Sequence, residues 1–232
     1  MYKRQILKYL ARSPGCSNGD IKGHVKSVSP NTAEQVGGYL KILIDRYRMI
    51  EKRLPIFAKP NARRGRYYIR DNFLRAWLSS LANPASAINF RPERLLVDAA
   101  NARPLEAEGH GLERLVGALY QERSRKGLPG FALTHQIEGY WDRSDTEIDL
   151  VAINVVDEVI RFGTCKRSQT KMVSDLDKYD GHIQRFLNAH GKYNSWTIEK
   201  VAIAPKIDDQ TRQQIRAKGY EPQDLTDLTK DL

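Results

Sequence analysis

Residues 147–166 read EIDLVAINVVDEVIRFGTCK, and this stretch determines how the second half of the chain folds. The segments Glu147–Asn154 and Glu158–Lys166 are rich in valine, isoleucine and other strand-forming residues, and only Val155–Asp157 separates them. A link this short joins neighbouring strands only when they run in opposite directions. The stretch therefore predicts two antiparallel strands side by side.

Charged side chains stand at fixed places on these two strands. Because side chains alternate between the two faces of a strand, Glu147 and Asp149 share one face of the first strand. Thr164 and Lys166 share one face of the second strand, while Cys165 points the opposite way, into apolar packing. We therefore expect the acidic pair and the lysine amine to meet in a single pocket.

Regular elements continue on both sides of the two strands. Apolar spacing predicts a helix over Gly111–Arg123, with Glu113 near the edge of its apolar face. A further strand precedes the pair, and a long helix, a strand, a short helix and an edge element in the tail follow it. The expected ranges of these five are Phe131–Trp141, Lys171–His190, Lys200–Ala204, Asp208–Ala217 and 219–232.

The predicted fold class is α+β or α/β. The order of helix, three strands, helix and strand is that of metal-dependent nucleases of the restriction-endonuclease type, the PD-(D/E)XK fold. In such enzymes two or three carboxylates hold Mg²⁺, because hard oxygen ligands suit a hard cation. A lysine steadies the attacking water or the charge that develops on phosphorus. The catalytic candidates are Glu113, Glu147, Asp149 and Lys166, with Glu113 and Asp149 as ligands of Mg²⁺ or Mn²⁺.

Positive charge is concentrated in the first third of the chain. Residues 1–80 hold 17 Lys and Arg against 5 Asp and Glu, a net charge of +12. Residues 81–232 hold 21 against 23, a net charge of −2. A basic part beside a near-neutral part is typical of a module that binds a polyanion. The alternative is an ordinary charged surface in contact with water.

Three short helices and two extended runs are predicted in this basic part. Apolar spacing predicts helices at 2–12, at 17–25 and from Asn31 onward, where Asn31 begins a capping-box pattern. Extended runs follow at Met49–Phe57 and Arg66–Arg70. This order is the winged helix-turn-helix arrangement, in which the third helix enters the major groove and the hairpin contacts phosphate.

Six polar side chains are expected to face DNA in such a domain. Arginines at a hairpin tip give affinity that depends on salt and little on sequence. The rival interpretation is a winged helix that packs against another domain. The DNA-binding candidates are Asn31, Gln35 and Lys41 on the third helix and Arg63, Arg64 and Arg66 on the hairpin.

A proline-containing connector is expected between two domains. Asp71 is expected to cap a helix whose apolar stripe includes Phe73 and Trp77, and Asn83-Pro84 is expected to end that helix. The expected parts are a winged-helix domain at 1–82, a connector at 83–105 with a short helix at Glu93–Ala100, and a nuclease-like domain at 106–232.

Four motifs, taken in order, resemble a known family. They are YYIRDNFLRAWLSSL at 67–81, GHGLERLV at 109–116, EIDLVAIN at 147–154 and IRFGTCKRS at 160–168. Together they resemble the C-terminal region of the archaeal-type ATPase family of archaea and bacteria. That region comprises a winged helix and a restriction-endonuclease-like domain of unknown function.

The resemblance implies a role for particular residues. Family members carry a glutamate in the first helix, an E-I-D triplet on one strand and glutamate-x-lysine on the next. Glu113, Glu147 and Asp149 stand at the first acidic positions. Lys166 stands at the lysine position, but Thr164 replaces the acid that precedes it. Because a neutral hydroxyl is a poor Mg²⁺ ligand, the resemblance implies a weakened metal site.

The resemblance also implies an ATPase module ahead of the winged helix. No GxxxxGK[ST] phosphate loop occurs in this chain, so ATP hydrolysis by these residues is not expected. The chain is then either part of a longer protein or a stand-alone relative that has an ATPase domain as a partner.

Other sequence signals are weak. Cys16 and Cys165 lie far apart and are expected as reduced thiols of a cytoplasmic protein. The five histidines lack metal-ligand spacing, and no apolar run is long enough to span a membrane. A membrane partner is therefore not expected, and the sequence does not indicate an oligomeric state.

Three functions remain open. The leading hypothesis is a DNA-binding protein whose nuclease-like domain cleaves weakly or not at all, because Thr164 replaces an acid. The second is an active DNA endonuclease that uses Mg²⁺ or Mn²⁺, the only case in which a cofactor is expected. The third is an interaction module that docks an ATPase domain through the stripe of Phe73 and Trp77.

Overall fold

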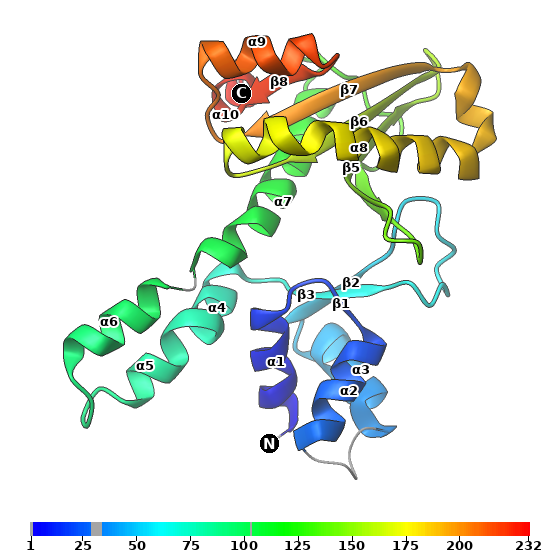
Figure 1. Ribbon diagram of the computed structural model, residues 1–232. Coiled ribbons are helices and arrows are strands. Elements are labelled where there is room, and N and C mark those ends of the chain that lie inside the picture. The colour runs from blue at the N-terminus through cyan, green and yellow to red at the C-terminus, as the bar shows by residue number, and fades with distance from the viewer. Residues whose placement is uncertain (1, 29–33, 103) are drawn as a thin grey trace. The chain divides into compact units, whose positions relative to one another are not determined.

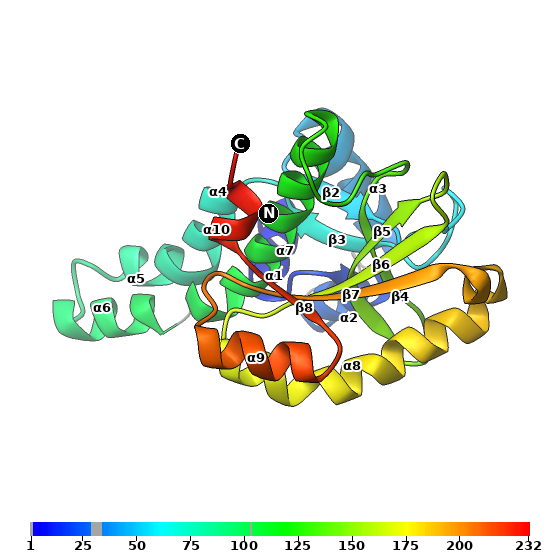
Figure 2. The same cartoon turned by 90° about the horizontal axis from the view of Figure 1, so that it is seen from above.

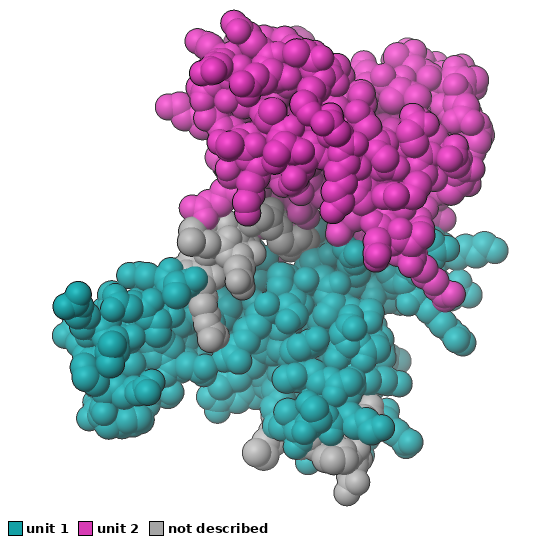
Figure 3. Space-filling view, in the orientation of Figure 1, with its two compact units in different colours: residues 1–54, 58–108 teal, residues 55–57, 109–232 magenta. Residues whose placement is uncertain are grey.

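The structure is a computed structural model that describes residues 2–28, 34–102 and 104–232, with 104–110 described by their backbone alone. Two compact units are formed, one by residues 1–54 and 58–108 and the other by 55–57 and 109–232 (Figure 3). The class is mixed α+β, which confirms the predicted fold class at that level. The segment 83–105, expected as a connector, belongs to the first unit.

The first unit combines helices with a small antiparallel sheet of strand order β1-β3-β2. Apolar residues spaced by one helical turn explain its core, since Ile6, Leu10, Val36, Leu40 and Leu43 are all buried in one cluster, as expected. The elements are α1 (Tyr2–Arg12), β1 (Cys16–Ser17), α2 (Asn18–Val28), α3 (Val36–Lys41), the π-helix η2 (Ile42–Arg46), β2 (Ile50–Arg53) and β3 (Arg66–Ile69) (Figure 1).

Strand β1 was not expected from the sequence. Cys16 pairs with Tyr67 and Ser17 with Arg66, which adds a short edge to the hairpin of β2 and β3. Ser17 also caps α2. Its Oγ accepts the backbone N–H of Asp20 at 3.2 Å, and Asp20 Oδ2 accepts the backbone N–H of Ser17 at 2.8 Å.

Further helices follow β3. Asp71 caps the first of them as expected, because its Oδ1 accepts the backbone N–H of Leu74 at 2.6 Å. The prediction that Asn83-Pro84 ends the helical run is wrong. Pro84 lies in the first turn of a new helix, where its missing N–H breaks no helical hydrogen bond. The elements are α4 (Asn72–Ala76), η3 (Trp77–Leu81), α5 (Ala82–Ser86) and α6 (Glu93–Asn101).

The apolar stripe of α4 and η3 is divided between two environments. Leu74 and Leu78 pack against the core of the first unit. Phe73 and Trp77 stack on each other at 6.5 Å between ring centroids, and Phe73 is 74% exposed. Half of the stripe therefore contributes to the core and half is presented to solvent in the described structure.

The second unit is a five-stranded sheet of order β4-β5-β6-β7-β8. Pairing is antiparallel from β4 to β6 and parallel from β6 to β8. The predicted order of helix, three strands, helix and strand is present, but β4 begins at Glu138 and not at Phe131. The elements are α7 (Pro104–Arg125), β4 (Glu138–Trp141), β5 (Glu147–Asn154), β6 (Val159–Cys165), α8 (Gln169–Ala189), η4 (Gly191–Ser195), β7 (Thr197–Ala204), α9 (Asp209–Ala217), β8 (Glu221–Asp224) and α10 (Leu225–Thr229).

Helices cover both faces of this sheet. Helices α8 and α9 lie on one face (Figure 2). On this face Leu176 and Phe186 share a buried cluster with Phe162 of β6. Helices α7 and α10 lie on the other face, where Val116 packs in a separate cluster with Cys165. Because side chains alternate between the faces of the strands, they contribute to two apolar cores, one on each side of the sheet.

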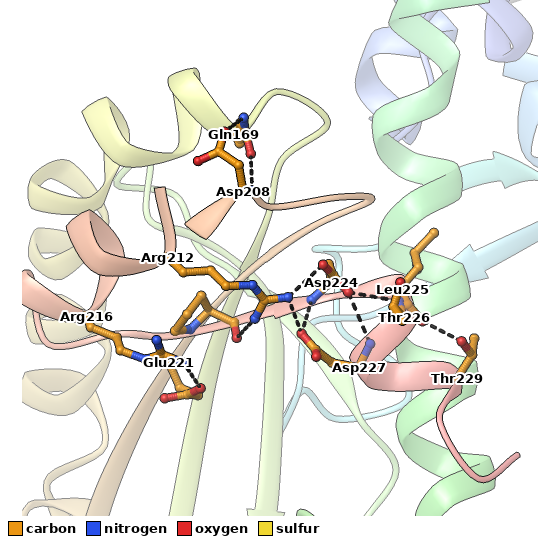
Figure 4. Close-up of polar contacts among 11 residues, drawn as sticks. Gln169, Asp208, Arg212, Arg216, Glu221, Asp224, Leu225, Thr226, Asp227 and Thr229 are labelled. Atoms are coloured by element: carbon orange, nitrogen blue, oxygen red, sulfur yellow. Dashed lines mark hydrogen bonds and ion pairs between the residues drawn. The ribbon is translucent and has the colours of Figure 1, made fainter. Parts of the chain in front are cut away.

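Ion pairs and hydrogen bonds connect the C-terminal elements α9, β8 and α10 (Figure 4). Arg212 of α9 lies 2.6 Å from Asp224 and 2.7 Å from Asp227. Asp224 also caps α10 in a capping box with Asp227. The Asp208 carboxylate that caps α9 bonds the side chain of Gln169 at the start of α8. These contacts connect the edge strand β8 to both of its neighbouring helices.

Among the described helices, none combines the length and the apolar character that a bilayer-spanning segment needs. Cys16 and Cys165 are both buried free thiols.

Candidate functional site

The predicted aspartate and lysine lie together at one end of the five-stranded sheet. Asp149 Oδ2 accepts a hydrogen bond from the Cys165 backbone N–H at 2.7 Å and another from the Thr164 hydroxyl at 3.2 Å. Lys166 Nζ lies 3.8 Å from the same oxygen. The Asp149 carboxylate of β5 therefore lies at the end of β6, next to Thr164 and Lys166, as the sequence predicted.

Two more predicted acids act on this carboxylate. Burial, and next the negative charge of Glu113, raise the pKa of Asp149 to about 6, while the Lys166 ammonium and the Cys165 N–H oppose the rise. The charge of Glu147 also raises the pKa of Asp149, by less than the charge of Glu113 does. The four predicted catalytic residues thus form one electrostatic cluster, contributed by α7, β5 and the end of β6.

Lys166 is held by the sheet at its backbone and reaches solvent at its tip. Its N–H donates to the Ile203 carbonyl of β7 at 2.9 Å, which extends the β6–β7 pairing beyond Cys165. Its side chain is 37% exposed, against 10% for Asp149. The ammonium can therefore pair with Asp149 and still approach a phosphate from solvent.

Thr164 and Cys165 point into different surroundings, as the alternation predicts. Phe162, two residues before Thr164, packs under α8, whereas Cys165 packs in the cluster under α7. Thr164 is 2% exposed. Burial raises the pKa of the Cys165 thiol well above its ordinary value, so this thiol is protonated at neutral pH and is a structural residue.

The described residues do not fit a tightly bound divalent cation in this arrangement. No group of three Asp, Glu, His or Cys side chains within the described ranges is placed to share one ion. Asp149 Oδ2 already accepts two hydrogen bonds, and its neighbour at position 164 offers a hydroxyl and not a second carboxylate. An Mg²⁺ or Mn²⁺ ion would have to gather Glu113 or Glu147 by side-chain movement.

Helix α8 contributes three residues that the sequence analysis did not single out. His182 Nδ1 accepts the backbone N–H of Glu147 at 3.0 Å, and Arg185 Nη2 lies 3.2 Å from the same ring nitrogen. Burial, and next the charge of Arg185, lower the pKa of His182. The Tyr179 hydroxyl donates to the Gly163 carbonyl at 2.6 Å. The sequence signal that could have identified His182 is a polar ring on the apolar face of a predicted helix.

Gly139 of β4 allows the backbone to pass close to the site. A Cβ at this position would lie 3.2 Å from the carbonyl oxygens of both Ile148 and Asp149, at a point where the β4–β5 register shifts. We expect Gly139→Ala to lower the free energy of unfolding of the second unit by about 1–2 kcal/mol, because the backbone must move apart. Urea unfolding measures the change.

The matched control is Gly181→Ala in α8, where a Cβ meets nothing within 4 Å. That variant should gain up to about 1 kcal/mol, since alanine favours a helix over glycine. Equal effects of the two substitutions would contradict the close approach at Gly139.

The DNA-binding candidates of the third helix are only partly described. Asn31 lies outside the described residues. Gln35 is exposed, directly precedes α3 and accepts a hydrogen bond from the Tyr39 hydroxyl at 2.9 Å. Lys41 is exposed at the last residue of α3. Gln35 and Lys41 are therefore accessible, and they come from the two ends of this short helix.

The hairpin candidates surround a tight turn. Arg63 and Arg64 are exposed between β2 and β3, and Arg66 is half-buried at the first position of β3. The Lys52 side chain lies over Gly65, so that a Cβ there would come 2.1 Å from Lys52 Cε. Sequence analysis missed Lys52, which adds a cation to the hairpin because strand pairing brings β2 beside the turn.

Comparisons of the chain with protein-family models, with characterised proteins and with solved structures found no match.

Proposed function

We propose that this chain is a DNA-binding protein with an N-terminal winged helix-turn-helix and a C-terminal nuclease-like domain that cleaves weakly or not at all. One observation carries the proposal. Asp149 lies 3.8 Å from Lys166, and the Thr164 hydroxyl lies 3.2 Å from the same carboxylate oxygen. An acid and a lysine on adjacent strand ends suit phosphodiester chemistry, but the hydroxyl removes a charge that a metal ion needs.

The first unit supports the DNA-binding part of the proposal. Three helices precede the hairpin of β2 and β3, which is the element order of a winged helix-turn-helix. Residues 1–80 carry a net charge of +12. Exposed Lys41, Arg63 and Arg64 stand on the helix and hairpin that would meet DNA.

A double substitution of the hairpin arginines tests DNA binding. We expect the full chain to bind duplex DNA at low salt, with an affinity that falls steeply as salt rises. Arg63→Ala combined with Arg64→Ala should weaken binding about tenfold or more and lower the salt slope by about 2, because two phosphate contacts are lost. Gel-shift titrations at several salt concentrations measure both quantities.

Arg125→Ala combined with Arg143→Ala removes two exposed arginines of the second unit and serves as the matched control. Its affinity should stay within about twofold of wild type. A wild-type chain that fails to bind DNA at low salt, or binds with no salt dependence, would overturn the proposed function.

An active endonuclease is the second candidate. It is favoured by the charge of Glu113, which acts on Asp149 from α7 and would supply a further ligand if it moved inward. DNA cleavage by the wild-type chain with Mn²⁺, lost on Asp149→Ala, would favour this function over the first.

A further inference from the structure

Helix α8 sends two side chains, one turn apart, to the part of the sheet that carries the acids. His182 Nδ1 accepts the backbone N–H of Glu147 at 3.0 Å. The Tyr179 hydroxyl donates to the Gly163 carbonyl of β6 at 2.6 Å and also faces the backbone N–H of Asp149. One helix therefore contacts both strands of the site through their backbones.

These contacts lie where the strand ladder ends. In the described structure the pairing of β5 with β6 stops at Leu150 and Gly163, directly before Asp149. Backbone N–H groups two residues apart in a strand point to the same side. His182 and Tyr179 thus meet the N–H groups of Glu147 and Asp149, which lie two residues apart at this unpaired end of β5.

Both α8 side chains are held firmly by the core. His182 is 8% exposed and Tyr179 is 6% exposed. Tyr179 packs in the cluster under α8 together with Leu176 and Ile183, so helix packing sets where its hydroxyl lies. Buried groups in fixed rotamers are what a preorganised site requires around its reacting residues.

We propose that Tyr179 and His182 are positioning residues that hold Glu147 and Asp149 in place through the strand backbone. The inference rests on the proposed nuclease-like site, whose acids these contacts would orient. Neither side chain need touch DNA or metal. Their effect is to fix the ends of the strands that carry the acids. Residues that do not touch a metal control its ligands in this way, by orienting them.

The charges around His182 fix its role as an acceptor. Burial lowers the pKa of His182, as do the charges of Arg185 and Lys178 on its own helix, while the charges of Glu147 and Asp149 on β5 act to raise it. The two cations and burial outweigh the two acids, so the ring is neutral at neutral pH. Because Nδ1 accepts from the Glu147 N–H and from Arg185, the ring proton must be on Nε2.

Ring and amide spectra of the full chain test the contact directly. The ¹⁵N shifts of the His182 ring should report an unprotonated Nδ1 and a protonated Nε2 at pH 7. His182→Leu should speed hydrogen exchange of the Glu147 amide about tenfold, which corresponds to ~1.4 kcal/mol and lies in the range for one lost hydrogen bond. His182→Asn, whose side-chain oxygen can replace Nδ1, should restore slow exchange.

A metal-binding measurement tests the functional consequence. In a Thr164→Glu background, Mn²⁺ affinity measured by calorimetry should fall by about 10- to 100-fold when the contacts that support the ligands are lost. Tyr179→Phe and His182→Leu should both show this fall. The control is Tyr120→Phe, which removes another buried hydroxyl, one that donates to Gln223 at 2.5 Å on the other face of the sheet.

Unchanged exchange of the Glu147 amide in His182→Leu, or equal Mn²⁺ affinities in Tyr179→Phe and Tyr120→Phe, would overturn the proposal. Absence of Mn²⁺ binding in the Thr164→Glu parent would count against the nuclease-like site itself. The amide and ring spectra would still decide whether α8 holds β5, so the two failures are distinguishable.

Discussion

Replacing Asp149 by asparagine is expected to stabilise the second unit by about 3 kcal/mol at pH 8 and to change its stability little at pH 4. Burial, and next the charge of Glu113, raise the pKa of this carboxyl from 3.8 to about 6. One pKa unit corresponds to about 1.4 kcal/mol. The folded protein therefore bears a free-energy penalty whenever Asp149 is ionised, and asparagine removes it.

The direction of the pH dependence follows from proton binding. Between about pH 4 and pH 6 the folded chain retains the Asp149 proton while the unfolded chain has lost it, so stability falls as pH rises. Below pH 4 both states are protonated and the penalty is absent. The side-chain oxygen of an asparagine at this position would still accept the Cys165 N–H, so the substitution leaves that hydrogen bond in place.

Urea unfolding in EDTA at pH 4 and pH 8 measures the effect. A Trp77→Phe background leaves Trp141 and Trp196, both in the second unit, as the fluorescent probes. The free energy of unfolding of wild type should fall between pH 4 and pH 8. That of the variant should change much less over the same range. If Asp149→Asn is no more stable than wild type at pH 8, the carboxylate is not strained by burial.

Asp142→Asn provides a control of opposite sign. Burial acts to raise the pKa of Asp142, but hydrogen bonds from Ser144 and Thr146 outweigh it, so the pKa lies below its ordinary value. Ionised Asp142 therefore stabilises the fold above the ordinary pKa, and this contribution is lost as pH falls. Because the folded pKa lies below 3.8, asparagine at this position should lower stability at both pH 8 and pH 4, and the loss should shrink only as pH falls further.

A buried carboxylate that destabilises its own fold is expected at a functional site. The residues that favour ionisation of Asp149 are Lys166 and the Cys165 N–H, yet they do not overcome burial and Glu113. Selection for stability alone would place a neutral residue here. The strain at Asp149 therefore supports a role in binding or chemistry for this end of the sheet.

Sequence reasoning predicted the order of the elements because each carries a local signal. The strands β5 and β6 follow from runs of strand-forming residues joined by a short link, and Asp71 marks a helix start by its capping chemistry. Strand β1 could not be predicted, because Cys16 and Ser17 form a strand only by pairing with the distant β3. Pairing of so short a segment depends on tertiary contact and leaves no local pattern.

The site was predictable in part for the same reason. Asp149, Thr164 and Lys166 meet because strand alternation and a short link fix their register. The sequence could mark His182 only as a polar residue on an apolar helix face; its contact with the Glu147 N–H was not predictable, because that partner is distant in the sequence. A cap such as Asp71 can be inferred because its backbone partner lies three residues away, whereas the backbone partner of His182 lies 35 residues away on another element.

Replacing Thr164 by glutamate is expected to make the stability of the second unit depend on a divalent cation. Thr164 is 2% exposed and its hydroxyl lies 3.2 Å from Asp149 Oδ2, so a glutamate would place a second buried carboxylate beside the first. Leaving a buried charge without a compensating partner costs about 3–5 kcal/mol. In EDTA the variant should therefore be less stable than wild type by about that amount.

Thr164→Gln separates charge from size. Glutamine has nearly the shape of glutamate and no charge, so its loss of stability measures the steric part alone. Addition of Mn²⁺ at about 100 times the dissociation constant should return about 2.7 kcal/mol to the glutamate variant. The glutamine variant and wild type should gain little, since they lack the second carboxylate.

The same experiment tests whether the site binds a metal ion and whether it cleaves DNA. If Thr164→Glu gains stability with Mn²⁺ and also cleaves DNA, and Lys166→Ala abolishes the cleavage but not the gain in stability, then the acids hold the ion and the lysine serves the chemistry. A glutamate variant that unfolds without any response to Mn²⁺ would show that Glu113, Asp149 and residue 164 do not converge on one ion. Thr164 would then be a core residue of a domain that never held a metal at this end of its sheet.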